Sequence, residues 1–186
     1  PGVVAATGMV TDADDRLVHA GLVHRPGGIP LALYRGAPRG EPGYLATTAV
    51  VHNVSAPHPF CVALDPGVLD LVARHLGAIG RGGDGEGGLR GPYALLDAVL
   101  AALGAGRRAV YVPYARFRAA RPEVLEEAWS GAERTRFAAR WREWLECGDP
   151  CHHPDLSLEH GDCRLRADPG AVPPGYRNPR RGYAGR

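Results

Sequence analysis

The stretch that decides the fold is Gly91 to Tyr114, GPYALLDAVLAALGAGRRAVYVPY. Its first half, from Pro92 to Leu103, consists almost wholly of apolar residues and good helix formers, and glycines follow it. This pattern predicts a helix with proline in its first turn. The run AVYVPY that follows is short, apolar and rich in β-favouring residues, which predicts a buried strand that ends at Pro113. A helix that leads directly into a buried strand is typical of an α/β fold.

Asp97 is the one charged residue in the predicted helix. Because this helix is apolar on almost every face, it must be covered on both sides. A carboxylate inside it is therefore either held by a specific partner or placed at an opening. The plain interpretation is a structural carboxylate near the start of the helix, bonded to backbone amides or to Arg107 or Arg108.

Composition limits the class of protein. The chain has 186 residues, 45% of them apolar, so one domain with one core is expected. Its basic residues are all arginine, but 22 basic against 20 acidic side chains leave a net charge of +2, which argues against nucleic acid as a partner. No apolar run has the length of a membrane span and no leader opens the chain, so we expect a soluble, cytoplasmic protein. The start at Pro1 suggests a fragment or a processed product.

Other segments predict further elements. Residues 3–10 (VVAATGMV) predict a buried strand, and residues 17–24 (LVHAGLVH) predict a second one. Residues 131–146 have the clearest amphipathic pattern and predict one long helix with an aromatic face. Residues 80–91 are dominated by glycine and predict a loop, and the last twenty residues are of low complexity.

Several of these segments resemble family-two nucleotide-sugar glycosyltransferases of the GT-A fold. Ala105–Tyr114 (AGRRAVYVPY) resembles the last strand of that catalytic domain, and His19-Ala20-Gly21 lies in a segment like the family's V-G-A-x-G…H-A-G stretch. Thr47–Leu64 resembles the V-x-N-V-S…C-L-L-V segment beside the acceptor pocket, and Asp149–Arg166 resembles the tail that closes the domain. The resemblance implies that residues 1–166 are the C-terminal, acceptor-side portion of a GT-A-like α/β domain. It would be a partial mixed sheet flanked by helices, with a C-terminal amphipathic helix, and residues 167–186 would be a flexible tail or linker.

The implied activity is transfer of a sugar from a nucleotide-sugar donor to a glycan or other hydroxyl acceptor with inversion, as in bacterial glycan biosynthesis. Inversion needs a carboxylate that takes the proton of the acceptor hydroxyl, and Asp97 falls on the second acid of the family motif. Ala94 and Leu95 stand where the family has Asn or Glu and the first Asp. The family's Asp-x-Asp element, which holds Mg²⁺ or Mn²⁺, has no counterpart here, so a nucleotide sugar is expected to bind only with the missing N-terminal half.

We therefore expect the isolated chain to be inactive as a hexosyltransferase. A non-catalytic glycan-binding or scaffold module derived from the same fold is the alternative, with a partner domain or a second copy as further possible partners. His52, Asn53 and His58 are the candidates for binding sugar hydroxyls, together with Arg107. The plain alternative for the histidines is a structural role near a strand end. Phe60 stands where the family has a small residue and is expected to crowd the acceptor path.

A second cluster of chemistry-bearing residues lies near the C-terminus. Cys147, Cys151, His160 and Cys163 form a candidate zinc set, within a stretch that also holds His152 and His153. The spacing matches no standard zinc motif, so reduced thiols with surface imidazoles, or a disulfide, are alternatives. A small zinc-stabilised interaction domain is the third functional hypothesis.

Overall fold

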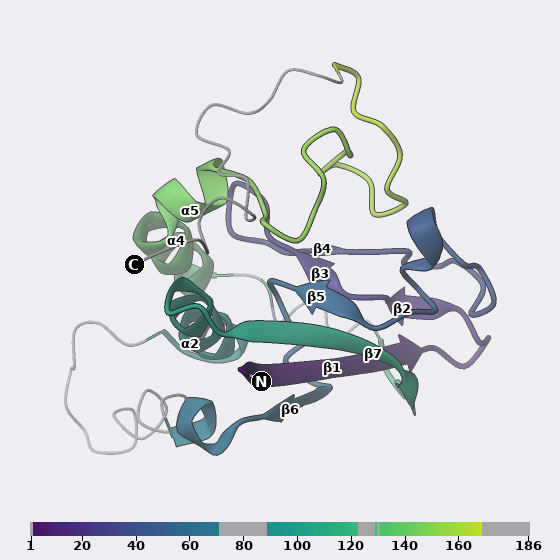
Figure 1. The fold of residues 1–186 in the computed structure, drawn as a ribbon, viewed down its shortest axis with the longest axis horizontal. Coiled ribbons are helices and arrows are strands. Elements are labelled where there is room, and N and C mark those ends of the chain that lie inside the picture. Colours follow the sequence, from purple (N-terminus) through teal and green to yellow (C-terminus); the bar gives the residue numbers. More distant parts are fainter. Residues whose placement is uncertain (1, 71–88, 123–128, 130, 169–186) are drawn as a thin grey trace.

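The computed structural model describes residues 2–70, 89–122, 129 and 131–168. Within them the chain forms a mixed α/β fold, in which a curled five-stranded mixed sheet is accompanied by a few helices (Figure 1). The predicted α/β class is confirmed at this level. The predicted tail and most of the predicted glycine-rich loop lie outside the described residues.

The sheet is organised around β1 (Val3–Thr11). β1 pairs in parallel with β7 (Arg108–Arg118) along one edge. Its other edge pairs antiparallel with β6 (Val62–Leu64) near its start and with β2 (Leu17–His19) at its end. The predicted strand at residues 3–10 is therefore confirmed, and it is buried along most of its length because strands flank both of its edges.

The remaining strands are short. β5 (His52–Val54) pairs antiparallel with the first half of β7, at the edge of the sheet. β3 (Leu22–Val23) and β4 (Leu31–Ala32) form a separate antiparallel hairpin, and a 3₁₀ turn, η1 (Tyr44–Ala46), leads toward β5. Figure 1 shows β6, β1, β7 and β5 side by side in this order, with the β3–β4 hairpin beyond them.

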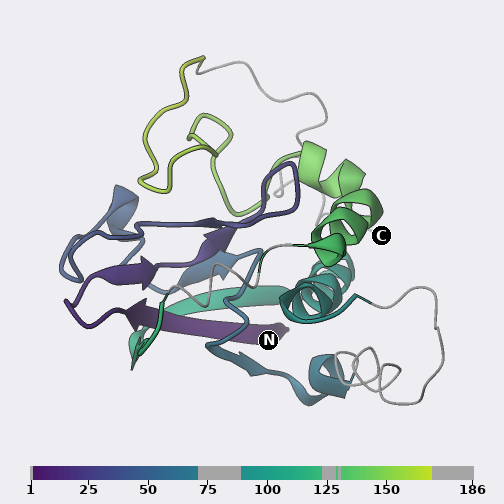
Figure 2. The same ribbon diagram turned by 180° about the vertical axis from the view of Figure 1, so that it is seen from behind.

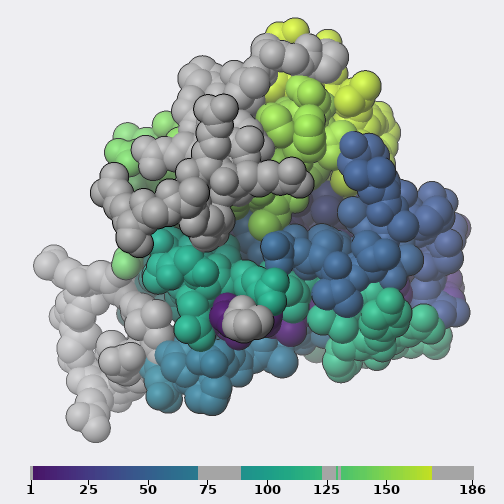
Figure 3. All heavy atoms as spheres, in the orientation of Figure 1, coloured from purple at the N-terminus to yellow at the C-terminus, as the bar shows by residue number. Residues whose placement is uncertain are grey.

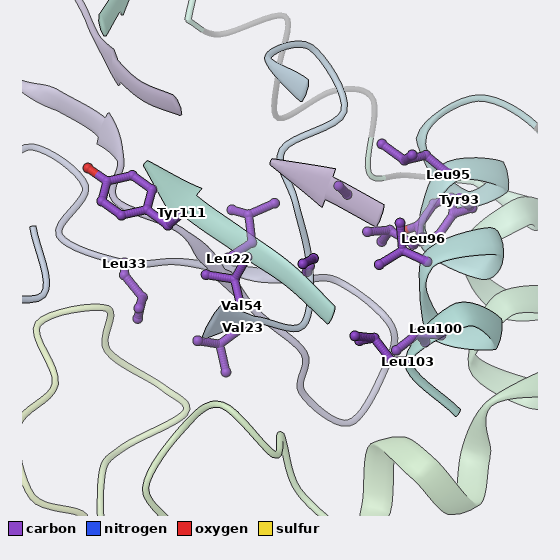
Figure 4. Close-up of a cluster of buried hydrophobic side chains, with 14 of the residues drawn as sticks. Leu22, Val23, Leu33, Val54, Tyr93, Leu95, Leu96, Leu100, Leu103 and Tyr111 are labelled. Atoms are coloured by element: carbon purple, nitrogen blue, oxygen red, sulfur yellow. The ribbon is translucent and has the colours of Figure 1, made fainter. Parts of the chain in front are cut away.

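The predicted central helix is confirmed as α2 (Pro92–Gly104). Pro92 occupies the first turn, and every residue from Tyr93 to Leu100 is buried. One side of α2 contacts β1 and β7, and another side contacts α4 (Ala132–Arg140). Figure 4 shows Leu96, Leu100 and Leu103 of α2 projecting toward the sheet. The helix is thus covered on both sides, as its almost uniformly apolar sequence requires.

The elements predicted at residues 17–24 and 131–146 are wrong in their extent. Residues 17–24 form two strands and not one, because the chain turns at Gly21, whose φ of 99° is a conformation that side-chain-bearing residues rarely adopt. Residues 131–146 form α4 and α5 (Arg142–Glu146), separated at Trp141 with φ −105° and ψ 20°. Trp141 leaves helical geometry at the position where its indole N–H donates to Asp97.

The segment after α5 is irregular and runs across the β3–β4 hairpin in both ribbon views (Figure 2). Asp149 joins it to the rest of the fold. Its buried carboxylate accepts hydrogen bonds from the backbone N–H of His24 at 2.7 Å, from the backbone N–H of Cys151 at 2.7 Å and from the Ser55 hydroxyl. Three segments far apart in sequence therefore converge on one carboxylate.

Candidate functional site

The site begins with an irregularity in β7. Gly8 of β1 pairs with Val112, but the next residue, Met9, pairs with Arg116, so Pro113, Tyr114 and Ala115 form a bulge. Pro113 has no N–H to give to a ladder, which makes this position suited to a bulge. The predicted end of the strand at Pro113 is therefore wrong, since β7 continues to Arg118. Figure 3 shows this half of β7 (green-teal) at the surface below residues 44–54.

A cavity of about 700 Å³ lies where the second half of β7 meets β1 and β6. We call it the β6–β7 cavity. Three parts of the chain line this cavity. They are residues 6–8 and 10 of β1, residues 58 and 60–63 in β6 and just before it, and residues 112, 115 and 117–121 in β7 and just after it. Residues from the segment that the family resemblance implies beside the acceptor pocket (58 and 60–63) thus meet the second half of β7 at this cavity.

Two aromatic rings line the β6–β7 cavity and are open to solvent. Phe60 is 55% exposed and Phe117 is 54% exposed. Leaving a phenylalanine ring half in water forgoes much of the burial free energy of about 1.5–3 kcal/mol that such a side chain can contribute. Exposed aromatic rings that line a concavity are a mark of a binding surface. Phe60 therefore lines the cavity with an open ring face, and its crowding of an acceptor path stays a prediction.

His58 supplies a neutral polar group to the same cavity. Its Nδ1 accepts a hydrogen bond from the backbone N–H of Phe60 at 3.4 Å, so in the neutral ring the proton is on Nε2, which is a donor. The ring stacks on that of His19 with centroids 4.3 Å apart and planes 3° from parallel. Burial lowers the pKa of His58 to about 4. The imidazole is therefore uncharged at neutral pH.

The other polar groups at this wall are tied to one another. The Thr7 hydroxyl donates to the carbonyl oxygen of Cys61 at 2.8 Å and accepts from the backbone N–H of His58 at 3.2 Å. Burial raises the pKa of the Cys61 thiol, so Cys61 is protonated at neutral pH and is no thiolate nucleophile. Among the residues that the structure describes, the charged side chains that line the cavity are Arg118 and Arg121. The cavity thus combines aromatic faces, a neutral imidazole and two guanidinium groups.

His58 also lines a second cavity, of about 610 Å³, between the β3–β4 hairpin and residues 159–164. Several of its charged groups are already used in internal contacts. Arg25 donates from Nε to the carbonyl oxygen of Ile29 at 2.9 Å, and Arg164 pairs with Asp162 at 2.7 Å. This second cavity is therefore the weaker candidate for a ligand site.

Asp97, the predicted catalytic base, lies elsewhere. It is 2% exposed and sits between α2 and the end of α4, where it accepts from the Trp141 indole N–H at 2.8 Å and pairs with Arg140 at 3.0 Å. It is not among the residues that line the β6–β7 cavity. Of the two possibilities that the sequence left open, a specific partner or an opening, the structure has the specific partner. The catalytic role of Asp97 stays a prediction.

The predicted substrate-binding residues are not gathered together. His58 lines the β6–β7 cavity, whereas His52 and Asn53 lie on β5, on the other side of β7. The Nδ1 of His52 is 3.1 Å from the carbonyl oxygen of Val50 and its ring contacts Tyr111. Arg107 precedes β7, at the opposite end of the strand from Arg118. Phe117, Arg118 and Arg121 were not predicted as site residues, because the strand was expected to end before them.

The predicted zinc ligands have different surroundings. Cys147 lines a depression beside α4 and α5, His160 lines the second cavity, and Cys163 packs in the core near Tyr34. Cys151 is exposed at the surface. Among the described residues, no three or more His, Cys, Asp or Glu side chains are placed to hold a metal ion, and all four cysteines are free thiols. Zinc binding stays a prediction, as does the Mg²⁺ or Mn²⁺ that the family resemblance implies.

Gly8 is required by the close approach of β7 at the bulge. A methyl group at this position would lie 2.5 Å from the carbonyl oxygen of Ala115 and 2.7 Å from the Phe117 ring. We expect Gly8→Ala to lower the free energy of unfolding by about 1–3 kcal/mol, because the backbone of β7 at the bulge must move to make room for the methyl group. Urea denaturation measures this free energy. Gly104→Ala is the matched control, since a methyl group there meets nothing within 4 Å. An unchanged urea midpoint for Gly8→Ala would contradict the close approach.

Across the described residues, no helix has both the length and the apolar character that crossing a membrane requires. Comparisons of the chain with protein-family models, with curated proteins and with solved structures found no match in any of the three.

Proposed function

We propose that this chain is an acceptor-side portion of a GT-A-like glycosyltransferase domain and that it binds a glycan without transferring a sugar to it. The β6–β7 cavity is the proposed binding site. The family resemblance of residues 3–166 supports the origin of the fold, and the chemistry of the cavity supports the ligand.

The observation that carries the proposal is the pair of exposed rings, Phe60 and Phe117, in one cavity. A pyranose ring presents C–H groups on its faces and hydroxyl groups around its rim. The C–H groups are attracted to the electron-rich face of an aromatic ring, and the ring also removes them from water. The N–H of His58 and the guanidinium groups of Arg118 and Arg121 are donors for the hydroxyl oxygens. Aromatic faces with donors beside them are the arrangement that a sugar needs.

The surroundings of Asp97 support binding without transfer. A general base must be free to accept a proton from a hydroxyl within hydrogen-bond reach. Asp97 is buried, and its carboxylate already accepts from Trp141 and faces the positive charge of Arg140. Charge-assisted contacts of this kind hold the carboxylate in place. Its role in this proposal is to join α2 to the end of α4.

We expect the purified chain to bind oligosaccharides on a glycan array and Phe117→Ala to weaken that binding about tenfold. A tenfold loss corresponds to about 1.4 kcal/mol, the size expected for one aromatic contact. Phe60→Ala is expected to act in the same direction. Affinities are measured by calorimetric titration with the best array ligand. Tyr114→Ala is the matched control, because Tyr114 lies on the same strand and is 72% exposed but does not line the cavity.

Three results would overturn the proposal. A blank array, with no binding in titration, would remove the glycan as ligand. Hydrolysis of a nucleotide sugar or sugar transfer by the chain, abolished by Asp97→Asn, would instead restore Asp97 as the catalytic base. Equal losses in Phe117→Ala and Tyr114→Ala would place the binding site outside the β6–β7 cavity.

A further inference from the structure

We infer that the β6–β7 cavity selects a glycan that carries an acidic group, a carboxylate or a phosphate, and that Arg118 and Arg121 hold this group. The inference rests on the proposed function and adds to it the class of ligand. It starts from the charge of the cavity.

Arg118 and Arg121 differ from Arg39, Arg140 and Arg164 in their surroundings. Arg39 pairs with Asp15 at 2.7 Å, Arg140 pairs with Asp97 at 3.0 Å, and Arg164 pairs with Asp162. The side chains of Arg118 and Arg121 make no hydrogen bond or ion pair with any residue that the structure describes, although both line the cavity. Their guanidinium groups are therefore available to a ligand.

The rest of the lining leaves the positive charge of these two residues in place. His58 is uncharged at neutral pH, and the Cys61 thiol is protonated. The other lining residues include Val62, Ala119 and Ala120, whose side chains are apolar. An acidic group that enters therefore meets two positive charges and no negative side chain among the described lining residues.

Guanidinium chemistry then identifies the class of ligand. The planar fork of an arginine side chain matches the two oxygens of a carboxylate or phosphate, and the resulting charge-assisted bonds are about twice as strong as neutral ones. Phe60 and Phe117 pack against the sugar face, while the arginines donate hydrogen bonds to the acidic group. A uronic acid and a sugar phosphate both satisfy this pattern, since each joins a pyranose ring to an anion.

The test is calorimetric titration of the whole chain with trigalacturonate, mannose 6-phosphate and the two uncharged counterparts, trigalactose and mannose. At least one of the acidic ligands is expected to bind about tenfold or more tightly than its counterpart. Whichever acid shows the larger ratio identifies the anion as carboxylate or phosphate. Arg118→Gln and Arg121→Gln are each expected to remove most of that preference. Raising the salt concentration from 0.05 to 0.5 M is expected to do the same, because it screens exposed charges.

Arg108→Gln is the matched control, since Arg108 is an exposed arginine at the far end of the same strand and does not line the cavity. It should leave all four affinities unchanged. Equal binding of acidic and neutral ligands, still sensitive to Phe117→Ala, would overturn the acid selectivity and leave glycan binding intact. A preference for acid that survives both arginine substitutions would also overturn it. Absence of binding to every ligand would remove the proposed function together with this inference.

Discussion

Replacing Asp149 by alanine is expected to lower the free energy of unfolding by about 4 kcal/mol at pH 7. The carboxylate accepts from the backbone N–H groups of His24 and Cys151 and from the Ser55 hydroxyl, and it is itself buried. Alanine would leave three donors without an acceptor, and each buried donor left unpaired costs about 1–3 kcal/mol. Urea denaturation followed by circular dichroism gives the free energy of unfolding directly.

Asp162→Ala is the control for this effect. Asp162 lies in the same C-terminal segment, but it is exposed and pairs with the exposed Arg164. Exposed pairs of this kind contribute little, so we expect a change within about 1 kcal/mol. If Asp149→Ala were no more destabilising than Asp162→Ala, the contact of three segments at Asp149 would not support the fold.

The free energy of unfolding is expected to fall as the pH drops below about 6.5. Burial among Phe137 and Trp144 lowers the pKa of His24 to about 3, and burial lowers that of His58 to about 4. In the unfolded chain, these histidines take up protons at the usual pKa of about 6.5. In the folded chain, the two buried imidazoles stay neutral until the pH approaches their lower pKa values. Stability is therefore full above 6.5 and is lost as the pH falls toward 3. Asp149 opposes this, because burial raises its pKa to about 6 and folding then favours its protonated form between about 6 and 4.

His24→Leu isolates the largest of these contributions. In the wild-type chain the imidazole of His24 has a buried Nε2 with no partner among the described residues. Between pH 6.5 and 4.5 each pH unit is worth about 1.4 kcal/mol for one such group. We therefore expect the loss of stability from pH 7 to pH 4.5 to be about 3 kcal/mol smaller in His24→Leu than in wild type. Denaturation curves at both values measure it, with exposed His153→Leu as control. An unchanged pH dependence would mean that His24 titrates normally in the fold.

The regular elements that carry strong patterns were predictable from the sequence. α2 and β1 match their predicted ranges closely, because a uniformly apolar helix and a β-rich apolar run are each decided by local composition. Among the elements with wrong extents, the break between α4 and α5 depends on one residue in tertiary contact. Trp141 leaves helical geometry where its indole reaches Asp97, 44 positions earlier in the chain, and no periodicity reveals such a contact.

The site was harder to predict than the fold. His58 was identified from its position in a family-like segment, but its neighbours across the cavity come from residues 112–121, beyond a proline that normally ends a strand. The parallel pairing of β1 with β7 brings these segments together over more than fifty residues of intervening sequence. The alternation of arginine and phenylalanine in ARFR after Pro113 was the available signal of an exposed strand.

The bulge in β7 divides that strand into a buried half and a half that faces solvent. Ala109 and Tyr111 are fully buried and fix the first half, whereas the residues after Pro113 face solvent and carry the proposed binding groups. Exchanging residues 116–121 for other sequences would therefore alter recognition with little cost to folding. A scaffold of this kind lends itself to grafting new specificities, with the buried half of the strand left untouched.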